Sequence, residues 1–128
     1  MTDNTRTRFM VLFSASPENM DTVGDFIARR LSRRFGGATL LHSAESTALT
    51  GYWAEDGDQF KALYEGQVHK EPVISLTLSV LPEDEDEAYS LIKETLSTAA
   101  KKFRMNIRHV HVETVITTAR HFDVGAMS

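Results

Sequence analysis

The chain has 128 residues, of which 41% are hydrophobic and 25% are charged, and it carries a formal net charge of −4. This length corresponds to one average domain with a single hydrophobic core, and the composition is ordinary for a globular protein. Because the sequence contains no cysteine, disulfides, zinc–thiolate sites, iron–sulfur clusters and thiol nucleophiles are excluded.

The N-terminal residues and the longest apolar run bear on targeting. Residues 1–6 lead into no apolar stretch of the kind that a secretory signal needs, and the run Phe9–Phe13 is far too short to span a membrane. We therefore expect a cytoplasmic protein that forms one domain over residues 1–128, with an ordered core of about residues 7–122. The net negative charge argues against nucleic acid as the main partner, because phosphate contacts dominate such affinities.

The first expected elements are a central strand and an amphipathic helix. Residues 8–16 are mostly apolar on both sides, as in a strand that lies inside a sheet. Ser16-Pro17-Glu18 provides an N-cap, a first-turn proline and an acid at the positive end of a helix. An apolar stripe at spacings of three and four follows, and Gly36-Gly37 ends it. The stripe consists of Met20, Val23, Ile27, Leu31 and Phe35.

The middle of the chain is predicted to form a long hairpin. Residues 38–42 begin a second strand, and residues 47–53 continue it in β-favouring residues. A turn signal, Glu55-Asp56-Gly57-Asp58, follows. Residues 60–70 fit either a helical turn or an extended segment. Residues 73–81 alternate between apolar and hydroxylated side chains, which predicts a half-buried third strand.

A second helix and a last strand complete the order of elements. Pro82 ends the third strand, and the acids at 83–87 occupy a first helical turn, where the helix dipole favours negative charge. A last strand is expected over about residues 107–122. Strand, helix, strand, strand, helix, strand is the order of the ferredoxin-like βαββαβ fold, an α+β fold whose antiparallel sheet carries both helices on one face. The other face needs solvent, a ligand or a second copy, so we expect a homo-oligomer, a dimer or trimer.

The last strand offers a candidate metal site. His109, His111 and Glu113 point to one side of it, because side chains repeat every two residues along a strand. Two imidazoles and a carboxylate suit zinc, iron or manganese. The same alternation describes any uncovered strand face, so a solvated or interface face is the competing interpretation.

Aromatic residues near the predicted turn are candidate ligand contacts. Tyr52 and the only tryptophan, Trp53, lie just before the turn, and Tyr64 follows it. Such side chains stack on ligands or anchor interfaces, and they equally complete a core. With His109 and His111, they form the predicted ligand-binding set.

Four arginines gather at the end of the first helix: Arg29, Arg30, Arg33 and Arg34. Positive charge is favoured there by the helix dipole, so a solvated face explains them. Contact with nucleic acid is the alternative, and it needs base-stacking aromatics beside the basic residues, which this stretch lacks. We find no glycine-rich phosphate loop, serine–histidine–aspartate order or redox motif in the sequence.

Two resemblances rest on short motifs. Gly51-x-Trp53, Asp56-Gly57, a glutamate at 65 or 71, the strand 73–80 and Lys102-Phe103 resemble a bacterial family of uncharacterised domains, over residues 38–116. This resemblance implies no activity.

The second resemblance is to the PII signalling proteins, which are ferredoxin-like trimers with a long loop between the second and third strands. Tyr64-Glu65-Gly66, Lys70-Glu71-Pro72 and the strand 73–80 are arranged similarly. The nucleotide-binding residues after the second helix are not matched, because Phe103-Arg104-Met105-Asn106 stands there.

Three functions follow as hypotheses. The first is a homo-oligomeric binding or regulatory domain that contacts a partner protein or small ligand through its open sheet face and the 42–72 hairpin. The second is a metal-dependent or cofactor-free enzyme that uses His109, His111 and Glu113. The third is a nucleic-acid binder that uses residues 29–34. The sequence leaves the cofactor and the presence of catalysis open.

Overall fold

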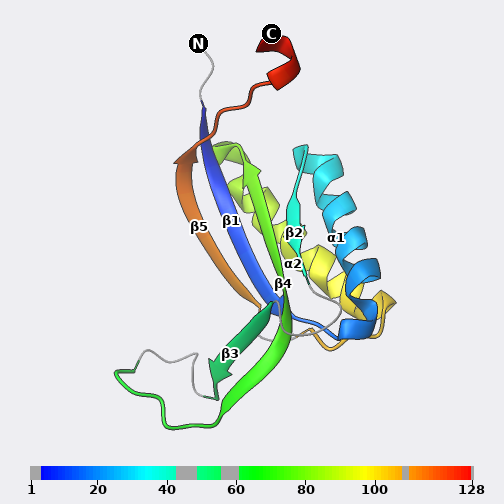
Figure 1. The fold of residues 1–128 in the computed structure, drawn as a ribbon, viewed down its shortest axis with the longest axis vertical. Coiled ribbons are helices and arrows are strands. Elements are labelled where there is room, and N and C mark those ends of the chain that lie inside the picture. The colour runs from blue at the N-terminus through cyan, green and yellow to red at the C-terminus, as the bar shows by residue number, and fades with distance from the viewer. Residues whose placement is uncertain (1–3, 43–48, 56–60, 108–109, 128) are drawn as a thin grey trace.

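The computed structural model describes residues 4–42, 49–55, 61–107 and 110–127 (Figure 1). Five strands and two long helices make up this part of the chain, and a short 3₁₀ turn precedes each helix. The elements are β1 (Thr5–Ser14), α1 (Met20–Phe35), β2 (Thr39–Leu41), β3 (Thr50–Ala54), β4 (Val68–Val80), α2 (Glu85–Lys102) and β5 (His111–Thr118).

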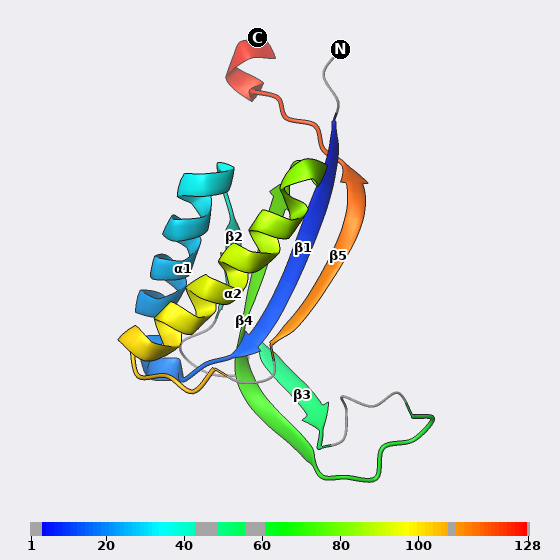
Figure 2. The ribbon, with the colours of Figure 1, turned by 180° about the vertical axis from the view of Figure 1, so that it is seen from behind.

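The strands form one antiparallel sheet in the order β2-β4-β1-β5, and β3 pairs with β4 further along. Both helices lie on the same face of this sheet, as the two opposite views show (Figures 1 and 2). The predicted α+β class and ferredoxin-like arrangement are therefore confirmed. The described helices include none that is both long and apolar enough to cross a membrane.

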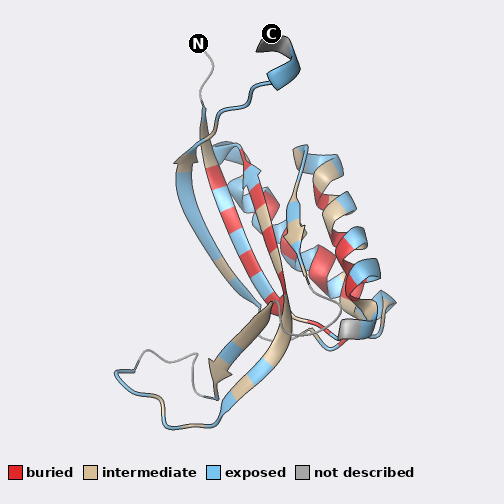
Figure 3. Ribbon diagram, viewed as in Figure 1, coloured by how far each residue is buried: buried red, intermediate tan, exposed pale blue. Residues whose placement is uncertain are grey.

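The core lies between the helices and the sheet. Phe9, Val11 and Phe13 of β1 are buried and stand opposite Leu78, Leu76 and Ile74 of β4. Figure 3 shows the resulting alternation of buried and accessible residues along these two central strands. Four members of the predicted stripe close the core from α1, and Ala88, Ile92, Leu96 and Ala99 do so from α2.

The ends of α1 follow from local chemistry with one correction. Ser16 was expected to cap the helix, but a 3₁₀ turn over Pro17–Asn19 intervenes and α1 begins at Met20. Ser16 acts through its backbone, since its carbonyl oxygen accepts the Asn19 N–H at 3.2 Å. The predicted stop is confirmed, because Gly36 is left-handed with φ 94° and donates its N–H to the Ser32 carbonyl oxygen at 2.8 Å.

The predicted long hairpin is present, but its first strand is interrupted. The register against β4 shifts by six residues between β2 and β3, since Leu41 pairs with Ser75 and Thr50 with Pro72. β3 nevertheless follows the same edge of β4 as β2. Pro72 accepts a hydrogen bond from Ala15 on the β1 side, whereas the Val73 N–H donates to Leu49 on the other side. Most of the predicted turn, and residues 47–48, lie outside the described residues.

Two strand boundaries differ from expectation. β4 begins at Val68 rather than Val73, so the ambiguous 60–70 segment ends as a strand because β3 provides its partner. The last strand covers His111–Thr118 and not 107–122. Its partner sets the limit, since β1 begins at Thr5 opposite Thr118 and only the bond from the Ala119 N–H to the Asn4 carbonyl follows.

Candidate functional site

The sheet face opposite the helices carries an apolar band. Residues that pair directly across strands lie on the same face, so this face gathers alternate side chains of β1, β2, β4 and β5. Four large apolar side chains on it remain exposed by 41% (Met10), 41% (Leu12), 58% (Leu41) and 49% (Val115). The predicted second apolar side of β1 is thus present but uncovered in the single chain.

We call this uncovered side of the sheet the open face. Polar side chains lie beside the apolar ones on it. Ser75 and Thr77 stand opposite Leu12 and Met10 on β4. Arg8 lies at one end of the face, opposite Val115. His111 and Glu113 lie on β5 opposite Leu12 and Met10, and His111 Nε2 is 2.6 Å from Glu113 Oε2.

The predicted metal set is only partly observable. His111 and Glu113 are together as the strand period requires, but His109 lies outside the described residues. Within the described ranges, no group of three histidine, aspartate or glutamate side chains is arranged to hold a metal ion. The three-residue metal site therefore stays a prediction.

The hairpin arm formed by β3 and the first half of β4 carries an aromatic cluster. Trp53 pairs with His69 across the strands, and their rings stack with centroids 4.4 Å apart at 25°. His69 Nε2 lies 3.4 Å from Glu55 Oε1. Tyr52 pairs with Lys70 on the opposite side of the arm, where Lys70 Nζ lies 5.9 Å from the Tyr52 ring centroid. No local pattern in the sequence singles out His69, and only the cross-strand register places it beside Trp53.

The arm extends the open face. Strand alternation places His69 and Glu71 on the same side of β4 as Val73 and Ser75. The close packing on this side requires glycine at position 51, because a Cβ there would lie 2.6 Å from Val73 Cγ1. Tyr64 instead lies in the loop before β4, where its hydroxyl accepts the Lys61 N–H at 3.1 Å. The structure thus joins Trp53 to the open face and puts Tyr64 outside the strands.

The four arginines lie in the helical layer, on the other side of the molecule. Three of them form ion pairs: Arg29 with Asp25, Arg30 with Glu94, and Arg34 with Glu87. The Arg34 hydrogen bond lowers the pKa of Glu87, and the same contact raises the pKa of Arg34. The helix dipole alone explains the arginines in the sequence, whereas the structure adds one pair within α1 and two pairs across to α2.

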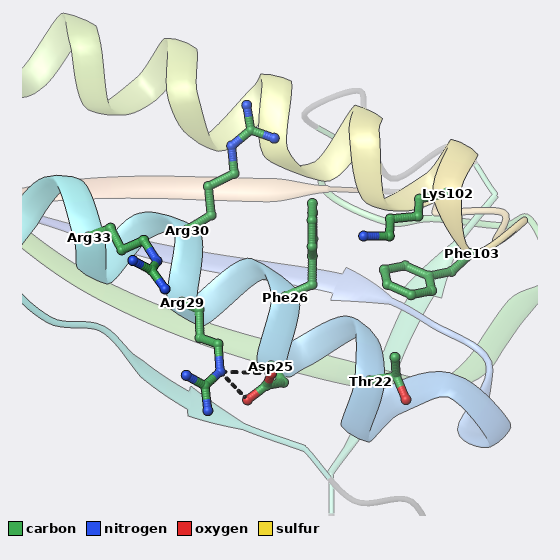
Figure 4. Close-up of a pocket in the computed structure, with 8 residues that line it drawn as sticks. All are labelled: Thr22, Asp25, Phe26, Arg29, Arg30, Arg33, Lys102 and Phe103. Atoms are coloured by element: carbon green, nitrogen blue, oxygen red, sulfur yellow. Dashed lines mark hydrogen bonds and ion pairs between the residues drawn. The ribbon is translucent and has the colours of Figure 1, made fainter.

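A shallow groove of about 510 Å³ runs beside these arginines (Figure 4). It is lined by Thr22, Asp25, Phe26, Arg29, Arg30, Arg33, Lys102 and Phe103. Aromatic rings do lie beside the arginines, contrary to the expectation from the sequence: Phe26 is on α1 itself, and the fold brings Phe103, directly after α2, against it with ring centroids 5.7 Å apart. This contact joins residues 77 positions apart, which a local pattern does not reveal.

Comparisons with known proteins identify similar structures at low sequence identity. A phage SAM lyase in complex with S-methyl-5′-thioadenosine is 14% identical, with a TM-score of 0.45 and 96% of each chain covered. CPII from Thiomonas intermedia K12, bound to ADP and bicarbonate, is 16% identical, with a TM-score of 0.36 and 90% of each chain covered. No protein-family model matches the chain, and no curated protein matches it in sequence. The resemblance to uncharacterised domains stays a prediction.

Proposed function

We propose that the chain is a homo-oligomeric binding domain. In this proposal a second copy covers the open face, and a small ligand binds where the hairpin arm of one copy meets the sheet of the other. The observation that carries it is the set of four exposed apolar side chains on the open face, Met10, Leu12, Leu41 and Val115.

A second copy suits this face better than solvent alone. Large apolar side chains that are exposed together on one face and rimmed by polar residues commonly mark an interaction surface. Covering one such half-exposed side chain contributes on the order of 1 kcal/mol. The face also carries both Arg8 and Glu113, so it offers opposite charges to an identical partner, as self-complementary interfaces require.

Light scattering during size-exclusion chromatography tests the assembly. The expected mass is a multiple of the 14.4 kDa chain. Leu12→Arg should shift it towards a monomer, because burying an added charge against a second copy costs desolvation energy. Tyr89→Arg is the matched control, since Tyr89 is 43% exposed on α2. A wild-type monomer, or equal masses for wild type and Leu12→Arg, would refute the assembly.

Ligand binding is tested on the arm. Trp53 is the only tryptophan, so its emission reports directly on the cluster with His69 and Glu55. A ligand found in a thermal-shift screen should raise the melting temperature by mass action and change Trp53 emission. The Trp53→Phe variant should lose most of the thermal shift. A shift that persists unchanged in Trp53→Phe would place the ligand elsewhere.

A metal-dependent enzyme is the second candidate. The contact between His111 and Glu113 favours it, because a carboxylate commonly orients a metal-binding imidazole through its other nitrogen. Elemental analysis should then find stoichiometric transition metal that is lost in His111→Ala. Metal-free protein after growth and purification without chelators would contradict it.

A further inference from the structure

The groove between α1 and α2 carries unbalanced positive charge. Of the described residues that line it, only Asp25 is acidic, and Asp25 already bonds Arg29 at 2.9 Å. Arg30 reaches across to Glu94 at 2.9 Å. Among the residues that the structure describes, Arg33 and Lys102 form no ion pair, so one uncompensated cation lines the groove from each helix.

Two partly buried aromatic rings accompany these cations. Lys102 Nζ lies 4.9 Å from the ring centroid of Phe26 and 5.6 Å from that of Phe103. The two rings meet edge to face at 76° and both line the groove. Figure 4 shows the rings beside Lys102 at one end of the groove and Arg33 towards the other end.

The lining has the form of a stripe rather than a single point. Phe26 and Arg33 are seven residues apart on α1, which corresponds to about 10 Å along the helix axis. That length spans about three nucleotides of a stacked single strand at about 3.4 Å each. A small inorganic anion would engage only one end of such a stripe.

We infer that this groove binds a short stretch of single-stranded nucleic acid. Arg33 and Lys102 contact phosphates, and the Phe103 ring packs against a base. Cations that follow a backbone beside aromatic rings are the combination that single-strand binding uses. The net charge of the chain is −4, so the binding is local to this groove, weak and strongly salt-dependent. The inference is independent of the proposed function, because the groove lies on the helical side of the sheet.

Fluorescence anisotropy of a labelled oligothymidylate over a salt series tests the inference. Each phosphate contact on a single strand contributes about −0.7 to the slope of log affinity against log salt. Arg33→Gln and Lys102→Gln should each make the slope about 0.7 less steep. Lys101→Gln is the matched control, since it removes the same charge on the adjacent residue, which does not line the groove.

The aromatic part has its own test. Phe103→Leu keeps an apolar side chain and should weaken binding by about fivefold or more, because stacking on one base contributes at least that much. The salt slope should stay unchanged, and circular dichroism should show an intact fold. Absence of binding at low salt, or equal effects of Lys101→Gln and Lys102→Gln, would overturn the inference. Equal binding of polyglutamate with no effect of Phe103→Leu would identify a general anion groove and overturn the strand assignment.

Discussion

Gly36 and Gly37 end α1 side by side, but only one of them needs to be glycine. Gly36 has a φ of 94°, whereas Gly37 has no positive φ, and a Cβ on either would meet nothing within 4 Å. Gly36→Ala therefore costs only backbone strain, about 1 kcal/mol, or about 4 °C in melting temperature. Gly37→Ala, measured by the same thermal unfolding, should cause no loss. Equal losses in the two variants would contradict this explanation of the helix end.

The Arg34–Glu87 pair predicts one component of acid sensitivity. The hydrogen bond from Arg34 lowers the pKa of Glu87 in the folded chain. A carboxyl with a lowered folded pKa stabilises the fold at pH values above the unfolded pKa, and this contribution disappears as the pH falls through the folded pKa. Glu87→Gln should therefore flatten the decline of the urea midpoint at acidic pH.

A neighbouring acid provides the control for this pH experiment. Glu85 occupies the same end of α2 and forms no ion pair with the described residues. Glu85→Gln should leave the acid decline close to that of the wild type. If both variants flatten the curve to the same extent, the effect comes from general charge reduction and not from the Arg34 contact.

At the scale of elements, the register predicts how β5 responds to proline. Odd-numbered residues of β5 bond to β1, as the Ala119 N–H bond to Asn4 indicates, so the N–H groups of Thr114 and Ile116 point to the outer edge. Val115→Pro removes a ladder bond and should cost about 1–3 kcal/mol. Thr114→Pro should cost markedly less in urea unfolding. A reversed order would mean that the pairing is shifted by one residue.

The hairpin arm predicts a tryptophan signal that depends on ring stacking. His69 stacks on Trp53 and lies 3.4 Å from Glu55. The imidazole covers one face of the indole, so His69→Ala should open that face to water and shift Trp53 emission to longer wavelength. His121→Ala, which changes a histidine of the C-terminal segment, should leave the emission unchanged. Equal shifts in the two variants would contradict the stacking.

The helices and central strands could be predicted from sequence because their signals are local. The spacing of Met20, Val23, Ile27 and Leu31 defines one buried stripe without knowledge of its partner. The ends of β4 and β5 could not be predicted from the sequence, because an extended segment becomes a strand only where a neighbouring strand bonds to it. β3 provides that neighbour for Val68. β5 ends at Thr118, because its partner β1 begins at Thr5.

In the candidate sites, contacts between residues close in the chain could be predicted from the sequence, and contacts between distant residues could not. Strand period alone places His111 beside Glu113. The stacking of His69 on Trp53 depends on hairpin register, and the meeting of Phe26 with Phe103 depends on the packing of two helices. Neither contact leaves a local pattern, and so the sequence identifies Trp53 and the arginines without the residues that surround them.

At the scale of the whole molecule, the two sides of the sheet differ in kind. The helical side encloses a core, while the open face leaves Met10, Leu12 and Val115 to solvent in a single chain. If identical copies cover that face, folding is coupled to association, and the melting temperature rises with protein concentration. For a dimer of this size the rise is about 3 °C per tenfold concentration.

Calorimetry over a wide concentration range measures this coupling. Leu12→Ala removes on the order of 1 kcal/mol of interface burial from each copy, and so it should weaken association by about tenfold for each 1.4 kcal/mol lost. At the same protein concentration, the variant should melt at a lower temperature than the wild type. It should reach the wild-type melting temperature only at a higher protein concentration. Leu63→Ala is a suitable control, because Leu63 is 72% exposed in the loop before β4. A melting temperature that is independent of concentration in the wild type would show that the open face is stable in water without a second copy.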